Sequence, residues 1–93
     1  DISGWNVGNA QTMRNMFSQA QSFNQDISGW NVGEVTDMGF MFWQASNFNQ
    51  DISGWDVGKV TTMAEMFLGT DFDQDISGWD VGKVTDMTKL FHF

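Results

Sequence analysis

Residues 26–42 read DISGWNVGEVTDMGFMF, and residues 51–67 read DISGWDVGKVTTMAEMF. The same five letters, DISGW, also begin at Asp1 and Asp75, so successive copies are offset by 25, 25 and 24 residues. Self-similarity at a fixed period of this length is typical of repeat architectures. The chain therefore divides into repeats 1–25, 26–50 and 51–74 and a truncated repeat 75–93, and we expect it to be an excerpt of a longer array.

Apolar residues fall into columns when the repeats are aligned. The clearest columns are Ile2, Ile27, Ile52, Ile76; Trp5, Trp30, Trp55, Trp79; Val7, Val32, Val57, Val81; Met13, Met38, Met63, Met87; and Phe17, Phe42, Phe67, Phe91. A single repeat is too small to bury its own apolar face, so neighbouring repeats are expected to cover one another. The columns predict a continuous core in which the tryptophans are buried.

Two spacings coexist within each repeat. Trp30 and Val32 alternate with Asn31, which is typical of a short strand with one buried face. Met38, Met41 and Phe42 stand at i, i+3 and i+4, which is typical of a short helix. The sequence therefore predicts a right-handed α/β repeat solenoid with one short strand and one short helix in each turn of about 25 residues. The spacing of Ile27, Trp30, Val32 and Val35 is similar to the core of leucine-rich repeats, and this resemblance implies that the solenoid is leucine-rich-repeat-like. The strands are expected to stack in parallel.

The combined motif W-[ND]-V-G-x-V-T-x-M-x-x-M-F, followed by F-N-Q-D-I, resembles the BspA-like leucine-rich-repeat family of bacterial surface proteins and lipoproteins. The resemblance covers essentially the whole chain. It implies an exported array, extracellular or at the cell surface, of a kind often associated with adhesion. One departure is that Val35 stands where leucine-rich repeats usually carry an inward asparagine.

The charge and the residue types exclude several classes of function. The formal net charge is −8, with only four lysine and arginine residues, which argues against nucleic acid as a partner. No segment is long and apolar enough to suggest membrane insertion. Cysteine is absent, and His92 is the one histidine. The repeats do not supply it with a nucleophile that would complete a catalytic pair. We expect no enzymatic activity.

The polar residues between the strand Trp and Val are candidates for an interaction strip. These residues are Asn6, Asn31, Asp56 and Asp80. Strand alternation predicts that they point outward, and glycines border them, so the strip is open to close approach by another backbone. The alternative is that the glycines only serve tight turns.

Trp43 is the other candidate contact residue. Its column otherwise holds Ser18, Leu68 and His92, so no repeat pattern requires an indole there. It is a candidate for an exposed contact residue, and simple partial burial is the favoured alternative.

Aspartates form a column of their own at Asp1, Asp26, Asp51 and Asp75. Stacked carboxylates repel one another, and two arrangements relieve the repulsion. Each carboxylate can cap backbone N–H groups of its own turn, or Ca²⁺ can sit between turns. Capping is favoured because no single repeat supplies a dense cluster of oxygens, so no cofactor is expected.

Two functional classes follow. In the first, the chain is an adhesin-like structural and interaction module that binds a protein or a cell-surface macromolecule. In the second, it is a building block of a self-assembling extracellular filament, held together by repeat stacking between copies. A Ca²⁺-stabilised array is a less favoured variant of either.

Overall fold

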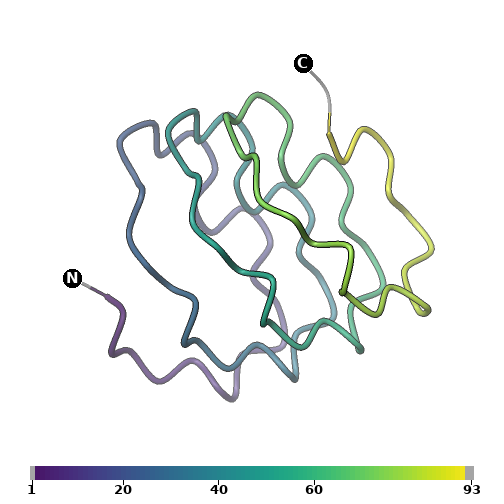
Figure 1. Ribbon diagram of the computed structural model, residues 1–93. Coiled ribbons are helices and arrows are strands. Elements are labelled where there is room, and N and C mark those ends of the chain that lie inside the picture. Colours follow the sequence, from purple (N-terminus) through teal and green to yellow (C-terminus); the bar gives the residue numbers. More distant parts are fainter. Residues whose placement is uncertain (1, 92–93) are drawn as a thin grey trace.

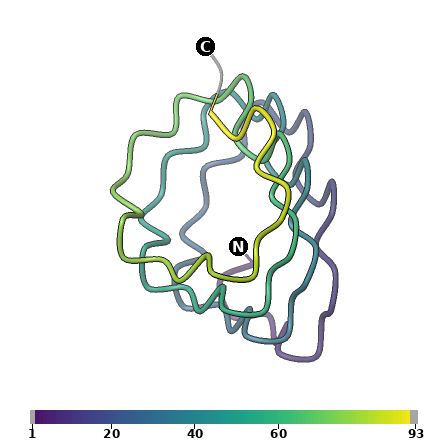
Figure 2. The ribbon, with the colours of Figure 1, turned by 90° about the vertical axis from the view of Figure 1, so that its right-hand side faces the viewer.

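The repeats follow one another as a stack of rings in the computed structural model, which describes residues 2–91 (Figure 1). Seen along the stack, each ring runs around a common centre (Figure 2). The body is compact, with extents of 31 × 28 × 21 Å. Asp1, from the aspartate column, and His92 lie outside the described residues.

The predicted α/β fold class is wrong. Residues 2–91 form no helix and no strand, and regular pairing is limited to three isolated parallel bridges, Thr12–Asp37, Asp37–Thr62 and Thr62–Asp86. A solenoid with one short strand and one short helix per turn, leucine-rich-repeat-like, is therefore not what this sequence forms.

Each ring is instead a succession of β-turns. In repeat 26–50 the turns are closed by the hydrogen bonds Trp30 N to Ile27 O, Val35 N to Val32 O, Met41 N to Met38 O, Ala45 N to Phe42 O and Phe48 N to Ala45 O, at 2.9–3.3 Å. Each bond joins residues three apart, which is the β-turn pattern, whereas an α-helix joins residues four apart. The i, i+3 spacing of apolar residues therefore marks the first and last residues of successive turns, and these residues supply the core.

Positive φ angles explain why the methionine and phenylalanine turns do not become a helix. Phe40 and Gln44, with φ of 60° and 55°, occupy the third position of their turns, where a type II turn requires positive φ. The equivalent residues behave alike: Asn15, Gln19, Glu65 and Lys89 have φ of 51–63°, and Gly69 has φ of 79°. Left-handed backbone costs roughly 1–2 kcal/mol for an L-residue, so these residues need support from outside their own turn.

Hydrogen bonds between rings provide that support. The N–H groups of Phe40 and Gln44 donate to the carbonyls of Ala64 and Leu68 in the next repeat, at 2.9 and 2.7 Å. Alternate residues of the same segment, Met38 and Phe42 among them, donate in the same direction. The pairing between repeats therefore holds each turn in a conformation that its own sequence does not favour.

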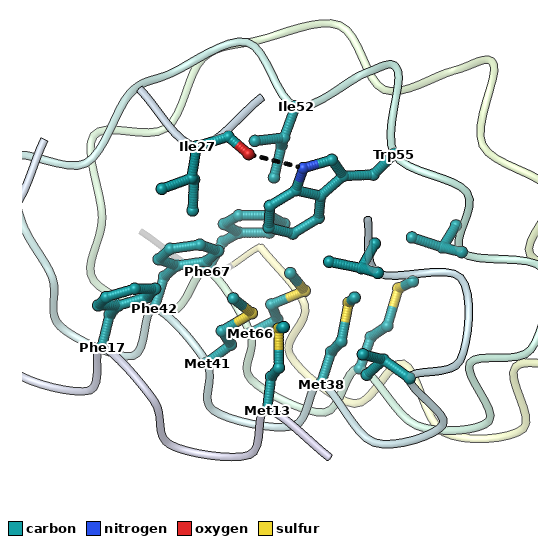
Figure 3. Close-up of a cluster of buried hydrophobic side chains, with 14 of the residues drawn as sticks. Met13, Phe17, Ile27, Met38, Met41, Phe42, Ile52, Trp55, Met66 and Phe67 are labelled. Atoms are coloured by element: carbon teal, nitrogen blue, oxygen red, sulfur yellow. Dashed lines mark hydrogen bonds between the residues drawn. The ribbon is translucent and has the colours of Figure 1, made fainter. Parts of the chain in front are cut away.

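The core is built from stacked columns (Figure 3). The Phe17, Phe42 and Phe67 rings are stacked at centroid distances of 5.6 and 5.7 Å with nearly parallel planes. Beside them Met38, Met41, Met63 and Met66 are fully buried. The predicted burial of the Trp column is confirmed for Trp30, Trp55 and Trp79, while Trp5 in the first ring is 57% exposed.

Candidate interaction surface

The predicted strip residues are all exposed, and each closes a local turn. The Oδ1 atoms of Asn6, Asn31, Asp56 and Asp80 accept hydrogen bonds from the N–H groups of Gly8, Gly33, Gly58 and Gly82 at 3.0–3.1 Å. Such bonds, from a side chain to the backbone two residues on, are local alternatives to regular secondary structure. The outward position predicted from strand alternation is correct, although a turn rather than a strand supplies it.

The stack brings neighbouring strip residues together. A Cβ atom added at Gly8 would lie 3.4 Å from Nδ2 of Asn31, and one added at Gly33 would lie 3.8 Å from Oδ2 of Asp56. The same glycines are also closely packed inside their own turns, because a Cβ at Gly33 would lie 3.1 Å from Oδ1 of Asn31. Close packing within the tight turn is therefore enough to explain why these positions are glycine.

A second glycine column has no such explanation. Its members are Gly4, Gly29, Gly54 and Gly78. A Cβ atom added at any of them would meet nothing within 4 Å, and none has a left-handed φ. Each is the third residue of an Ile-Ser-Gly-Trp turn closed from Trp N to Ile O. Neither conformation nor packing within residues 2–91 requires glycine there.

We call the two exposed columns, Gly4, Gly29, Gly54, Gly78 and Asn6, Asn31, Asp56, Asp80, the Gly/Asx strip. Oδ1 of each Asn or Asp is used in its own turn, which leaves Nδ2 of Asn31 and Oδ2 of Asp56 without a hydrogen bond to any described residue. The strip carries amides in its first two repeats and carboxylates in the next two. It offers donors at one end and acceptors with negative charge at the other.

Trp43 belongs to a different part of the ring. It is half-buried, its ring meets Phe40 edge-on at 6.3 Å, and its Nε1 is buried without a hydrogen-bond partner among residues 2–91. Arg14 lies over the Phe40 ring at 5.0 Å and pairs with Asp37 at 3.3 Å. The structure therefore places Trp43 in a local cluster that joins two repeats and does not bring it into the strip.

The aspartate column caps turns, as favoured from the sequence. Asp26, Asp51 and Asp75 accept hydrogen bonds from the N–H groups two residues on at 2.9–3.0 Å. Hydrogen bonds from the backbone and side chain of Ser28 lower the pKa of Asp26. The pKa of Asp51 is lowered by the side chain and backbone of Ser53, against a smaller opposing effect of the neighbouring aspartates. Ca²⁺ binding stays an untested alternative.

An asparagine and glutamine ladder was missed from the sequence. Asn24 Oδ1 accepts from Asn49 N at 2.9 Å, and Asn49 Oδ1 accepts from Asp73 N at 2.9 Å. Gln50 Nε2 donates to the Asn24 carbonyl at 2.8 Å, and Gln74 repeats the contact with Asn49. The recurrence of Asn and Gln after the second Phe was the available signal. Its role is to join repeats, which removes these side chains from the candidate site.

These features define a tandem-repeat protein made of stacked rings of β-turns, with a repeated polar strip on its surface. The chain belongs to the family described as Mycoplasma protein of unknown function, DUF285, whose model matches residues 1–93. No curated protein and no solved structure matches the chain. The family match agrees with a bacterial repeat protein, and the BspA-like resemblance stays a prediction. Residues 2–91 include no helix long and apolar enough to cross a membrane.

Proposed function

We propose that the chain is an extracellular structural and interaction module, adhesin-like and not enzymatic, that binds a protein or a cell-surface macromolecule along the Gly/Asx strip. The observation that carries the proposal is the glycine column at Gly4, Gly29, Gly54 and Gly78, which nothing within the described residues explains. Glycine allows another backbone to approach closely. A partner lying on the strip makes use of that room.

The strip also supplies directional contacts. The free Nδ2 of Asn31 is a hydrogen-bond donor, and the free Oδ2 of Asp56 is a charged acceptor. Because every repeat presents the same pair of positions, a partner with its own periodicity can engage several repeats at once. Linked weak contacts of this kind raise the overall affinity without any single deep pocket.

The test is binding of the labelled 93-residue chain to cultured cells and immobilised extracellular-matrix proteins. Gly29→Leu and Gly54→Leu each place a large side chain on the strip in space that is open in the free chain. We expect saturable binding that each substitution weakens about tenfold or more, which corresponds to at least about 1.4 kcal/mol. The matched control is Asn47→Leu, at an exposed position of another turn.

Binding that survives both glycine substitutions, or that Asn47→Leu weakens equally, contradicts the proposal. Circular dichroism and thermal melts of the three variants show whether each keeps the fold. Because no internal neighbour lies within 4 Å of the added Cβ atoms, we expect the melts of the glycine variants to match the parent.

The second candidate function is a building block of an extracellular filament. What supports it is that consecutive repeats are joined by backbone hydrogen bonds such as Phe40 N to Ala64 O, a kind of contact that repeats of another copy can also make. Electron microscopy separates the two functions, because uniform filaments favour assembly and single particles that bind cells favour the adhesin-like module.

A further inference from the structure

We infer that the aromatic pair Phe40 and Trp43, with the side chains beside it, is a second binding site that takes a neutral sugar unit of a glycan. The site is separate from the Gly/Asx strip and does not depend on it. Phe40 and Trp43 belong to the second ring, which has a described ring on each side, so further rings at either end of the stack would not cover them.

Three side chains depart from the repeat pattern and meet at this place. They are Arg14, Phe40 and Trp43, whose columns otherwise hold Gly39, Ala64, Thr88; Asn15, Glu65, Lys89; and Ser18, Leu68, His92. The Arg14 guanidinium lies over the Phe40 ring at 5.0 Å, and the Phe40 and Trp43 rings meet edge-on at 6.3 Å. The other rings form without these side chains, so the fold does not require them.

The turn that carries the pair breaks two local rules. Phe40 has φ of 60°, which is uncommon for any residue other than glycine. Trp43 buries its Nε1 without a hydrogen-bond partner among residues 2–91, although buried indole N–H groups usually find one. The contact with Arg14 explains Phe40 as a link between repeats, but it does not explain Trp43. Departures from local preference that bring no gain to the fold indicate a functional site.

The exposed part of Trp43 is apolar. Its side chain is half-buried and Nε1 is covered, so the indole atoms that solvent reaches are carbons. Its backbone is also engaged, because Trp43 N donates to Phe40 O at 3.1 Å and Trp43 O accepts from Gln19 N at 2.6 Å. A flat aromatic carbon surface is what the C–H face of a sugar ring packs against.

Two side-chain amides border the indole. Gln44 follows Trp43 in the chain, and the backbone N–H of Gln19 donates to Trp43 from the first ring. Both glutamines are exposed, and neither side chain has a hydrogen-bond partner among the described residues. Their φ angles are 63° for Gln19 and 55° for Gln44, whereas the third ring has Gly69 in this column. An amide both donates and accepts, which suits the hydroxyl groups of a sugar.

Charge and size favour a neutral sugar over other partners. Arg14 is already paired with Asp37 at 3.3 Å, and Glu65, one ring on from Phe40, has no ion pair within residues 2–91. The unpaired carboxylate disfavours an anionic ligand. A stable protein interface covers about 800 Å² on each partner, whereas a Trp side chain offers at most about 250 Å². The site therefore matches one or two sugar units and is too small for a protein surface.

The test is an NMR titration of the ¹⁵N-labelled 93-residue chain with methyl glycosides of neutral hexoses and N-acetylhexosamines. The Trp43 indole N–H signal, identified by its loss in Trp43→Leu, should shift with at least one glycoside while the other indole signals stay in place. Trp43→Leu installs the residue that the third ring carries at Leu68, so it should fold. It should weaken binding about tenfold or more. Its Tm should equal or exceed that of the parent, because the unpaired N–H is gone.

Two further variants complete the experiment. Gln44→Gly should weaken sugar binding while raising the Tm, a combination that a purely structural role for Gln44 does not give. Gly54→Leu, on the Gly/Asx strip, should bind the glycoside like the parent, so this inference and the proposed function can fail separately. A parent whose indole signals respond to none of the glycosides, or a Trp43→Leu variant that binds as well as the parent, overturns the inference. Binding to a matrix protein that Trp43→Leu abolishes, but that enzymatic removal of the glycans from that protein leaves intact, assigns the site to a protein partner and overturns it too.

Discussion

The indole Nε1 of Trp55 donates a hydrogen bond to the backbone carbonyl of Ile27, 28 residues earlier in the chain, at 3.1 Å. The same contact joins Trp30 to Ile2 and Trp79 to Ile52 (Figure 3 shows the Trp55 case). A buried indole N–H needs a partner, and here the partner belongs to the neighbouring repeat. The bond therefore helps to fix how each repeat is aligned on the repeat before it.

Replacing Trp55 with phenylalanine should be strongly destabilising. The substitution removes the hydrogen bond to Ile27 and leaves unfilled volume at a site that is 4% exposed. We expect the free energy of unfolding to fall by about 2–4 kcal/mol, measured by urea denaturation. Trp5→Phe is the matched control, and it should change stability by less than about 0.5 kcal/mol. If Trp55→Phe and Trp5→Phe lowered the free energy of unfolding equally, the contact of Trp55 with the neighbouring repeat would be unimportant for stability.

Replacing Gln44 with glycine should stabilise the protein. Gln44 has φ of 55°, and its side chain is exposed. Glycine adopts this conformation without the steric cost of an L-residue, and the gain of roughly 1 kcal/mol should exceed the entropy that glycine loses on folding. Thermal and urea unfolding measure the change. Ser46→Gly, at a position without positive φ, should instead be neutral or destabilising.

The period, the columns and their burial could be predicted from the sequence because the side chains repeat at fixed offsets. The secondary structure could not, because i, i+3 spacing is shared by helices and by successive β-turns. Glycine at the third position would have marked the methionine and phenylalanine turns, but among the positive-φ residues of those turns within residues 2–91 only Gly69 is glycine. Phe40 and Glu65 take positive φ because bonds to the next ring hold them there. Long-range pairing overrides local preference at these positions.

The exposure of the strip was predictable for a similar reason. Asn31 and Asp56 lie between buried residues, so either a strand or a turn directs them outward. The distinction between the two glycine columns was not predictable. A Cβ at Gly33 would lie 3.1 Å from Oδ1 of Asn31, whereas a Cβ at Gly29 would meet nothing within 4 Å, and only the three-dimensional arrangement reveals this difference.

In the acid range, the protein should lose stability as the pH is lowered. The pKa values of Asp26, Asp51, Asp75 and Asp86 are lowered from the usual 3.8, chiefly by hydrogen bonds from serine or threonine two residues on. A folded-state pKa below the unfolded value gives stability that is present above the unfolded pKa and is lost as pH falls through the folded pKa. The Tm should therefore hold from pH 7 to about pH 5 and drop below about pH 4. Asp51→Asn should reduce the slope of that drop, and a parent Tm that rises on acidification would contradict the capping role.

Removing divalent metal should leave the protein unchanged. Asp26 and Asp51 are engaged by the N–H groups of Ser28 and Ser53, so each carboxylate already has a partner. We expect the Tm in EDTA to equal the Tm in excess CaCl₂ within a degree. A fall of several degrees in EDTA, restored by Ca²⁺ and abolished in Asp51→Asn, would instead establish the Ca²⁺-stabilised array.

Deleting one repeat should weaken the whole chain. Removal of residues 26–50 joins Gln25 to Asp51, keeps the spacing of the DISGW copies and removes one ring from the stack. Stability in a stacked array depends on the contacts between neighbours, so the urea midpoint should fall. The urea m-value should drop by about a quarter, because it scales with the surface exposed on unfolding.

The control for the deletion replaces residues 26–50 with a second copy of residues 51–74. It keeps the number of rings, and it should unfold close to the parent because the apolar columns are continuous. A deletion variant as stable as the parent would mean that each ring folds on its own. The contacts between rings argue against that outcome, since Phe40 and Gln44 owe their left-handed backbone to bonds with Ala64 and Leu68.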